Sequence, residues 1–463
     1  MGVNMKKIRL GAGAGFSGDR IDPAVELATH AQLDYLIFEC LGERTVAAGQ
    51  LRRRNDPEAG YDPLLLDRID AVIDHTLAAG TTIITNGGSA NPLGAATAVA
   101  EMLKRRGVAR TVRIAAVTGD DVGDIVRSVD PDVWETGEPV SVYSSELLSA
   151  NAYIGADSLV SALREEPDIV IAGRVADPSL YLAPMVHEFG WSMDDVDLLG
   201  KGTCVGHLLE CAGQLTGGYF ADPGPKDVPG LATLGFPYAD VGADGSATVA
   251  KLERSGGLLD VRTCREQLLY EVHDPQRYIT PDVTADFSRV GFTEVSPGQV
   301  RVSGATGARA PESLKVSLGF RGGWTGEGQI SYAGPRAEER ARLAGDIVVE
   351  RMSRFHGVPS GELTVELIGT GSAFRGAPGA RGPLGECEGR TSVIPEVRLR
   401  VSGVLDSRKK ADAVRWEVET LYTNGPAGGG GARGSVVPVV AIRAASLARN
   451  EVVTAVDIQE VSS

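Results

Sequence analysis

The chain has 463 residues, more than one ordinary hydrophobic core accommodates, so its length predicts two or three domains. Its content of 43% hydrophobic and 23% charged residues is typical of a globular protein. The formal net charge of −15 argues against a nucleic-acid partner, because binding a phosphate backbone requires a basic surface.

The chain also lacks the sequence features of a membrane or secreted protein. No apolar run approaches the roughly 18–20 residues that span a bilayer. Lys6, Lys7 and Arg9 are followed by glycines rather than by the apolar segment of a secretory signal. The five cysteines are scattered and form no C-x-x-C pair: Cys40, Cys204, Cys211, Cys264 and Cys387. These features predict a cytoplasmic protein with reduced thiols and no membrane contact.

Strand and helix patterns alternate in the first half of the chain. Asp22-Pro23 is typical of a helix start, and Gly80 of a helix end. The expected strands are Lys7–Ala14, Asp34–Cys40, Thr81–Thr85, Val112–Thr118 and Asp168–Gly173, and the expected helices are 22–32, 64–80, 95–106 and 157–164. Continuous apolar strands separated by helices predict an α/β domain with a largely parallel sheet and helices on both faces.

The composition changes at the Pro- and Gly-rich segment 219–230, which is typical of a linker. Beyond it, turn-punctuated strands are expected at 246–251, 299–303, 314–320, 363–368, 396–401 and 436–442, with helices at 337–356 and 407–422. This pattern favours a second, α+β domain. The expected domains are therefore residues 1–222 and 223–463.

A glycine motif follows the first strand. Gly13, Gly15 and Gly18 fit the G-x-G-x-x-G spacing of dinucleotide-binding folds, and Glu39 stands where a ribose-binding acid would lie. In that fold the helix begins within the motif, whereas here Pro23 places the helix start later. An NAD site therefore stays an alternative to a glycine turn that lets the backbone approach a ligand.

Polar residues follow several of the expected parallel strands, and such segments gather at one edge of a sheet. They are Ser17, Asp19, Glu39, Asn86, Asp120, Asp121, Arg174 and Asp177. Acids beside an arginine suit a divalent cation or a carboxylate substrate, and Asp120 and Asp121 are the candidate metal ligands. Helix caps and turns explain the same residue types equally well.

The segment 203–216 (TCVGHLLECAGQLT) predicts an amphipathic helix. His207, Glu210, Cys211 and Gln214 fall on one face at spacings that bring neighbours within about 5–6 Å at Cβ. A histidine oriented by a carboxylate is a workable general base, and the same pair could ligate a metal. Cys211 is a candidate nucleophile, and a solvated helix face is the alternative to all of these roles.

A glycine run separates the last helix from the last strand. It begins after Asn424 and includes Gly428, Gly429, Gly430 and Gly431. Consecutive glycine amides can bind a phosphate or a developing oxyanion. A flexible connector is the competing interpretation.

Eight ordered segments, from about Lys7 to Val456, resemble the acyclic terpene utilisation protein AtuA family. They are IRLGAGAGFSGDRIDPAVELA, DYLIFECLGERT, TNGG, AAVTGDD, IAGRVADPSLYLAP, GHLLECAGQLTGGYFADPG, LLYEVHDPQRYITPDVTADF and LYTNGPAGGGG. The resemblance implies a bacterial enzyme of acyclic terpene breakdown, where intermediates are CoA thioesters. Longer relatives carry an extra C-terminal ferredoxin-like domain, which this sequence lacks, so a separate small ferredoxin-like partner is an expectation.

Together these observations lead to one main hypothesis, a lyase or hydratase acting on a branched carboxylic acid or acyl-CoA thioester. His207 is the expected base, oriented by Glu210. Arg174 or the glycine amides would stabilise an anion, with Asp177 beside Arg174. A CoA thioester substrate, a divalent metal and a homo-oligomer are expected. The alternatives are a non-catalytic subunit or ligand-binding module that works with a CoA enzyme, and an NAD-dependent enzyme.

Overall fold

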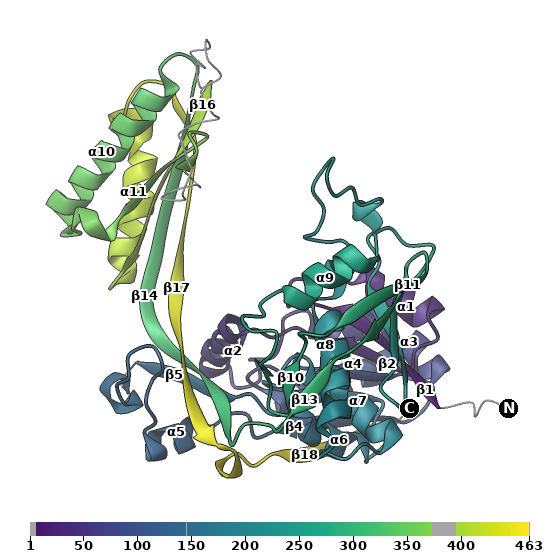
Figure 1. The fold of residues 1–463 in the computed structure, drawn as a ribbon. Helices are drawn as coiled ribbons and strands as arrows, with labels where there is room; N and C mark the ends of the chain where they lie inside the picture. The colour runs from purple at the N-terminus through teal and green to yellow at the C-terminus, as the bar shows by residue number, and fades with distance from the viewer. Residues whose placement is uncertain (1–5, 145, 373–394, 463) are drawn as a thin grey trace. The chain divides into compact units, whose positions relative to one another are not determined.

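The computed structural model describes residues 6–144, 146–372 and 395–462, and it divides the chain into two compact units. The first unit contains residues 1–319 and 442–463, and the second contains residues 320–441. The second unit is therefore an insertion near the end of the first. The chain passes between the units within two long strands, β14 (Ser313–Ala333) and β17 (Gly429–Ala448) (Figure 1).

The first unit is built on a ten-stranded sheet in the order β11-β12-β8-β7-β1-β2-β3-β6-β4-β18. Five central strands, from β1 to β4 in that order, are parallel, and the strands on either side of them are antiparallel. The strands are β1 (Lys7–Ala14), β2 (Tyr35–Phe38), β3 (Thr82–Thr85), β4 (Val112–Thr118), β6 (Ile169–Ala172), β7 (Pro237–Gly242), β8 (Ala247–Lys251), β11 (Gly291–Ser296), β12 (Gln299–Ser303) and β18 (Ala455–Val461).

Helices connect and cover the parallel strands. The helices α1, α3 and α4 pack in one row, and α6, α7 and α8 pack in a second row. The described helices of this unit are α1 (Asp22–His30), α2 (Glu43–Asn55), α3 (Leu65–Ala79), α4 (Pro92–Arg106), α5 (Gly123–Val129), α6 (Ala156–Leu163), α7 (Ser179–Phe189), α8 (Val196–Glu210) and α9 (Val261–Leu269). The α/β class with a largely parallel core, expected from the sequence, is confirmed.

Local sequence explains where these elements begin and end. Pro23 occupies the first turn of α1, where a missing backbone N–H leaves no hydrogen bond unmade. Gly80 ends α3 in the left-handed conformation that favours glycine. All four residues of β2 and of β6 are buried, as expected for strands covered on both faces.

Three short strands and one longer strand complete the first unit. The strands β9 (Tyr278–Ile279), β10 (Thr284–Asp286) and β13 (Thr306–Ala308) form a small separate sheet that packs on α8. The strand β5 (Leu147–Ala152) pairs with β14. None of the helices in the described part of the chain is both long and apolar enough to cross a membrane.

The second unit has its own core. Its elements follow the order β14, α10 (Ala337–His356), β15 (Thr364–Ile368), β16 (Glu396–Leu405), α11 (Arg408–Asn424) and β17, with sheet order β15-β16-β14-β17. This is the β-α-β-β-α-β pattern of ferredoxin-like domains. The two helices pack together, and α10 and α11 both contact β16 (Figure 1). Ile330, Val348, Leu399 and Val418 are among the buried residues between them.

The boundary between the units differs from the expected one at residues 222 and 223. The segment 219–230 does not separate two units, because β7 and β8 follow it and β7 pairs with β1 in the main sheet. The α+β composition seen beyond residue 223 thus combines an antiparallel extension of the first sheet with the inserted unit.

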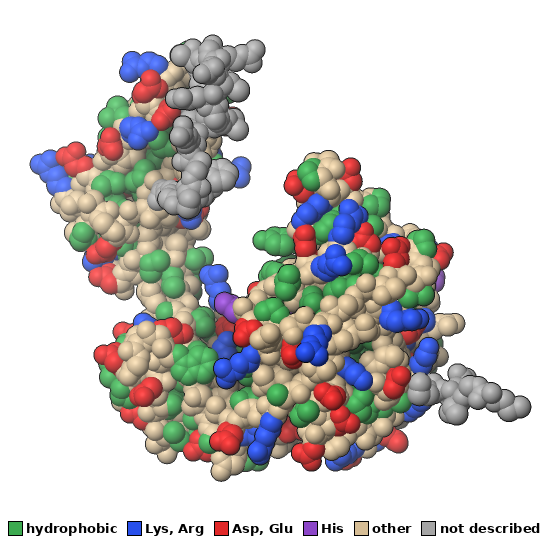
Figure 2. Space-filling view, viewed as in Figure 1, with side chains coloured by type: hydrophobic (Ala, Val, Ile, Leu, Met, Phe, Trp, Pro, Cys, Tyr) green, Lys and Arg blue, Asp and Glu red, His purple; other side chains and the backbone are tan. Residues whose placement is uncertain are grey.

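Charged side chains of both signs are interspersed on the face of the chain shown in Figure 2.

Candidate functional site

The carboxyl ends of three parallel strands border a cavity of about 720 Å³ in the first unit. Gly15 follows β1, Glu39 follows β2, and Arg174 and Asp177 follow β6. The end of α8 supplies His207, Glu210 and Cys211, so the structure brings these sequence-predicted residues together. The other lining residues include Asp19, Arg20, Glu43, Tyr153, Gln214, Tyr219, Tyr270, Glu271, Tyr278 and Lys315.

His207 is fully engaged by the protein on both ring nitrogens. Its Nδ1 lies 2.8 Å from Oε1 of Glu210, and its Nε2 lies 3.1 Å from the carbonyl oxygen of Leu268. A carbonyl can only accept, so Nε2 must carry the proton. The ring is 1% exposed and packs against the rings of Tyr278 and Phe287, whose centroids are 5.0 and 5.7 Å away. His207 therefore has no free nitrogen for a ligand.

Glu210 is the member of the pair that has an oxygen atom without a hydrogen-bond partner among the described residues. Its Oε1 faces His207, whereas its buried Oε2 has no hydrogen-bond partner among the described residues. Burial raises the pKa of Glu210 to about 7, against the lowering effect of His207. The His207 pKa is also raised, because the carboxylate of Glu210 and the hydrogen bonds outweigh burial. Near neutral pH, Glu210 can thus accept or release a proton.

The helix that carries this pair ends earlier than the sequence predicts. The α-helix α8 stops at Glu210, and residues 212–214 form a single 3-10 turn in which Ala212 has a φ of 42°. Gln214 therefore does not continue the helical face of His207 and Glu210. The solvated-face interpretation is wrong for His207 and Glu210, because every residue of the helix from Gly202 to Glu210 is buried.

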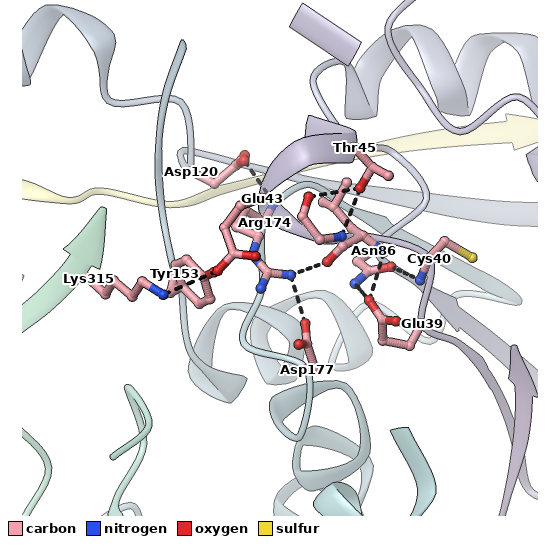
Figure 3. A network of polar contacts seen from close by, with 12 residues as sticks. Glu39, Cys40, Glu43, Thr45, Asn86, Asp120, Tyr153, Arg174, Asp177 and Lys315 are labelled. Carbon is pink, nitrogen blue, oxygen red and sulfur yellow. Dashed lines mark hydrogen bonds and ion pairs between the residues drawn. The ribbon is translucent and has the colours of Figure 1, made fainter. Parts of the chain in front are cut away.

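Arg174 forms a second buried centre in the cavity wall (Figure 3). Its Nη1 donates to Oδ1 of Asp177 at 2.7 Å and to the carbonyl of Leu41, and its guanidinium lies 4.0 Å from the centre of the Tyr153 ring. Beyond the ring, Glu43 accepts hydrogen bonds from the Tyr153 hydroxyl and from Lys315. These contacts fix a buried cation beside the cavity, with carboxylates on two sides.

The carboxyl groups of this centre respond differently to their surroundings. Burial raises the pKa of Glu43, but the hydrogen bond from Tyr153 and the charge of Arg174 outweigh it, so the Glu43 pKa falls to about 2. Burial raises the pKa of Asp177 despite the opposing effect of Arg174. Glu43 is therefore a permanent anion near neutral pH, whereas Asp177 holds a proton more readily than an exposed aspartate.

Glu39 is a second carboxyl group with one occupied oxygen. Its Oε1 accepts from the backbone N–H of Leu41 at 2.7 Å and from Nδ2 of Asn86 at 2.9 Å. Figure 3 shows Glu39 next to Asn86. Asn86 in turn accepts from the N–H of Cys40 at 2.7 Å. Burial, followed by the nearby Asp177 charge, raises the pKa of Glu39 to about 8. The loops after β2 and β3 thus hold a protonated carboxyl group in the cavity wall.

Cys211 lines the cavity next to Glu210, but its chemistry does not suit a nucleophile. Burial and the neighbouring Glu210 charge raise the pKa of its thiol. The thiolate is the reactive form, so a raised pKa opposes nucleophilic attack. Cys40, Cys204 and Cys264 are also free thiols, and Cys387 lies outside the described residues.

Asp120 and Asp121 border a different cavity, of about 500 Å³, at the carboxyl end of β4. Oδ2 of Asp120 accepts from the backbone N–H of Arg174 and from Nδ2 of Asn151, so Asp120 fixes the loop that carries Arg174. Asp121 accepts from Gln50. The described part of the chain shows no group of three or more His, Cys, Asp or Glu side chains placed to hold a metal.

The glycine motif bends the chain toward α8 rather than opening a helix. The N–H of Gly15 donates to Oδ2 of Asp19 at 2.9 Å, and α1 begins only at Asp22. A Cβ on Gly15 would lie 2.6 Å from the backbone carbon of Cys211, so this glycine permits the close approach of β1 to the end of α8. Gly13 packs on Phe38, and Gly18 on Phe16. An NAD site stays a prediction without support from this geometry.

The second glycine run belongs to the second unit. The helix α11 ends at Asn424, and Gly429 already begins β17. Gly428 and Gly431 have left-handed φ values of 77° and 65°. The carbonyl of Gly431 accepts from Arg398, and that of Ala427 accepts from Arg340. Anion binding by Gly428, Gly429, Gly430 and Gly431 therefore stays a prediction.

The sequence analysis missed several cavity residues, among them Glu43, Tyr153, Tyr278 and Lys315. Glu43 begins α2, a polar helix with only weak hydrophobic periodicity, so its sequence pattern predicted neither the helix nor a site residue. Tyr153 directly follows β5 and Lys315 lies in β14, and neither strand belongs to the parallel core whose pattern predicted the site. Glu43 and Tyr278 lie within the quoted motifs DYLIFECLGERT and LLYEVHDPQRYITPDVTADF, which could have indicated them.

These features define an α/β protein with a carboxyl-rich ligand cavity at the carboxyl edge of a parallel sheet, the usual ligand position in such sheets. The model of the family described as "Acyclic terpene utilisation family protein AtuA" matches residues 8–458, nearly the whole chain. The chain belongs to this family. No curated protein and no solved structure matches it.

Proposed function

We propose that the protein is an enzyme of acyclic terpene utilisation, with a branched carboxylic acid or its CoA thioester as substrate and a lyase or hydratase type of reaction. Membership of the AtuA family supports the metabolic setting. The observation that carries the chemistry is the buried Oε2 of Glu210, which has no hydrogen-bond partner among the described residues and belongs to a residue that lines a cavity large enough for a small-molecule substrate.

In this proposal Glu210 transfers the proton, and His207 is a positioning residue. His207 holds Oε1 of Glu210 and is itself held by the Leu268 carbonyl. This arrangement reverses the roles expected from the sequence. A carboxyl group with a pKa of about 7 suits general base catalysis near neutral pH, because both of its protonation states are populated there.

Glu39 supplies the complementary acid. Its Oε1 is fixed by Leu41 and Asn86, and its higher pKa keeps it protonated when Glu210 has released its proton. In water removal, Glu210 takes the proton at C2, and Glu39 gives a proton to the departing hydroxyl at C3. In C–C cleavage, Glu210 takes the proton of the C3 hydroxyl, and Glu39 protonates C2 as the C2–C3 bond breaks. Two carboxyl groups with separated pKa values serve both reactions.

The cavity lining places the reacting end of the substrate. Among the lining residues, Asp19, Glu39, Glu43, Asp177, Glu210 and Glu271 are acidic, and Arg20, Arg174 and Lys315 are basic. The raised pKa values of Glu39, Asp177 and Glu210 mean that these acids are not all ionised near neutral pH, so the lining carries no large excess of negative charge. The carboxyl groups that transfer protons line this cavity, so the acyl and thioester portions of a CoA substrate occupy it. Arg174, held by Asp177 and the Leu41 carbonyl in the cavity wall, is a cation that stabilises negative charge on the thioester oxygen during the reaction.

Turnover of branched 3-hydroxyacyl-CoA and 2-enoyl-CoA thioesters tests the proposal. We expect wild-type protein to consume at least one of them and Glu210→Gln to lower kcat by about 10²–10⁴-fold, the usual contribution of a general base. The control is Asp282→Asn, which alters a buried acid that does not line the cavity and should retain wild-type kcat. Equal turnover by Glu210→Gln and wild type would contradict the proposal.

A further inference from the structure

A smaller side cavity of about 410 Å³ adjoins the candidate site. The two cavities share four wall residues: Tyr153, Asp177, Tyr278 and Lys315. All residues that line the side cavity belong to the first unit. The short turn after β6 divides the spaces, because Asp177 lines both, whereas its neighbours Ala176 and Pro178 line only the side cavity.

The side cavity differs from the main cavity in its chemistry. Its apolar wall includes Trp134, Ala176, Pro178, Ile279, Pro281 and Leu314. Its ionisable groups are Asp177, Arg277, Lys315 and the two tyrosines. Trp134 and Ile279 are 57% and 53% exposed, so the apolar wall includes large side chains that a ligand can cover. An apolar space beside a polar one suits an amphipathic ligand.

Tyr278 lines both spaces. Its ring contacts the His207 ring at a centroid distance of 5.0 Å, and the same residue lines the side cavity. Ile279 follows it in β9 and lies in the side-cavity wall. The two spaces therefore adjoin at Tyr278, so a ligand with its polar end at Glu210 has apolar surroundings on the far side of this residue.

We infer that the side cavity binds the hydrocarbon chain of the substrate, with Ile279 as a residue that determines chain-length specificity. This inference rests on the proposed function, because it places the reacting end at Glu210. Each methylene group buried in the side cavity should strengthen binding about fourfold, which corresponds to the usual transfer free energy of that group.

Calorimetric titration of the full-length protein with straight-chain primary alcohols, from butanol to octanol, tests the inference. These probes are neutral, so the charged groups that line the two cavities neither attract nor repel them strongly. We expect affinity to rise about fourfold per methylene in wild-type protein. Ile279→Asp should abolish this dependence, because it places a charge in the apolar wall. Val295→Asp, a change at a comparably exposed strand residue outside the side cavity, should retain it.

Affinity that is independent of chain length, or the same dependence in Ile279→Asp as in wild type, would overturn the inference. The binding measurement is also separable from catalysis. The dependence should persist in Glu210→Gln, which leaves the side cavity unchanged. If the chain-length dependence of alcohol affinity is lost in Ile279→Asp but wild-type protein turns over no thioester, the role of the side cavity is supported and the proposed function is contradicted. If wild-type protein turns over a thioester but alcohol affinity does not depend on chain length, the proposed function is supported and the role of the side cavity is contradicted.

Discussion

The pair formed by His207 and Glu210 shows how hydrogen bonds assign roles to neighbouring groups. The ring of His207 has a protein partner at each nitrogen, whereas Glu210 has one oxygen without a partner. The residue types alone favour histidine as the base, since its ordinary pKa lies nearest to neutrality. The surroundings reverse this preference, because burial brings the Glu210 pKa to about 7 and the protein occupies both histidine nitrogens.

The pH dependence of activity should report this arrangement. Glu210 must be ionised to act as a base, so kcat/KM should rise with pH through its pKa of about 7. His207 lowers that pKa, so His207→Gln should move the rise to higher pH, by roughly one unit for each 1.4 kcal/mol of lost interaction. The measurement is kcat/KM against pH for both proteins. A lower rate with an unshifted profile would mean that His207 has only a structural role.

At the scale of elements, the junction between β1 and α8 determines whether the cavity forms. A Cβ at Gly15 would lie 2.6 Å from the Cys211 backbone, which cannot move without shifting the end of α8. Gly15→Ala should therefore destabilise the protein by about 1–3 kcal/mol and weaken ligand binding at Glu210.

Gly18→Ala is the matched control for this junction. Its Cβ would meet the ring of Phe16, an exposed side chain that can rotate away. The midpoints of urea unfolding of both variants provide the comparison. If Gly18→Ala proves as destabilising as Gly15→Ala, then the contact with α8 does not explain the requirement for glycine.

The elements with strong sequence patterns were predicted well. The strands β1 and β4 and the helix α10 occupy their predicted residues, because continuous apolar runs and a long amphipathic period give clear signals. The strand β14 is much longer than the predicted 314–320, because Gly322, Gly323, Gly326 and Gly328 interrupt its pattern. The helix α8 ends early at the strained Ala212, which no residue type in 203–216 indicates.

The site was also predicted only in part, because some of its residues follow from local patterns and others depend on long-range contacts. Parallel strand order brings Gly15, Glu39 and Arg174 to one edge, and this rule needs only local patterns. The contributions of Tyr153 and Lys315 depend on how β5 and β14 pair, which is a long-range property. The partners of His207 likewise depend on Leu268 of α9, sixty-one residues away.

At the scale of the whole molecule, each unit has a separate core and its own buried charges. In the second unit, Glu417 is fully buried and accepts hydrogen bonds from Arg351 and His356 at 2.6 and 2.8 Å. In the first unit, the buried Asp282 accepts from the N–H of Ala156 and from Ser179. The cavity and side cavity lie in the first unit alone.

Two unfolding transitions should therefore appear in calorimetry. Glu417→Gln removes a charge from a buried pair and should lower one transition, with a loss of about 1–3 kcal/mol. Asp282→Asn should lower the other transition. Alcohol binding to the first unit should stay unchanged in Glu417→Gln. A single transition that both variants lower equally would show that the units unfold together.

The central claim, that Glu210 is the base of the reaction, is tested most directly by deuterium incorporation at C2 of a thioester substrate or product in D₂O, followed by NMR. In water removal Glu210 itself takes the C2 proton, and in C–C cleavage Glu39 delivers a proton to C2 only when Glu210 takes the C3 hydroxyl proton, so both reactions require Glu210 for deuterium to reach C2. We expect enzyme-dependent deuterium incorporation with wild type and Asp282→Asn, and its loss with Glu210→Gln. Undiminished exchange with Glu210→Gln would contradict the claim.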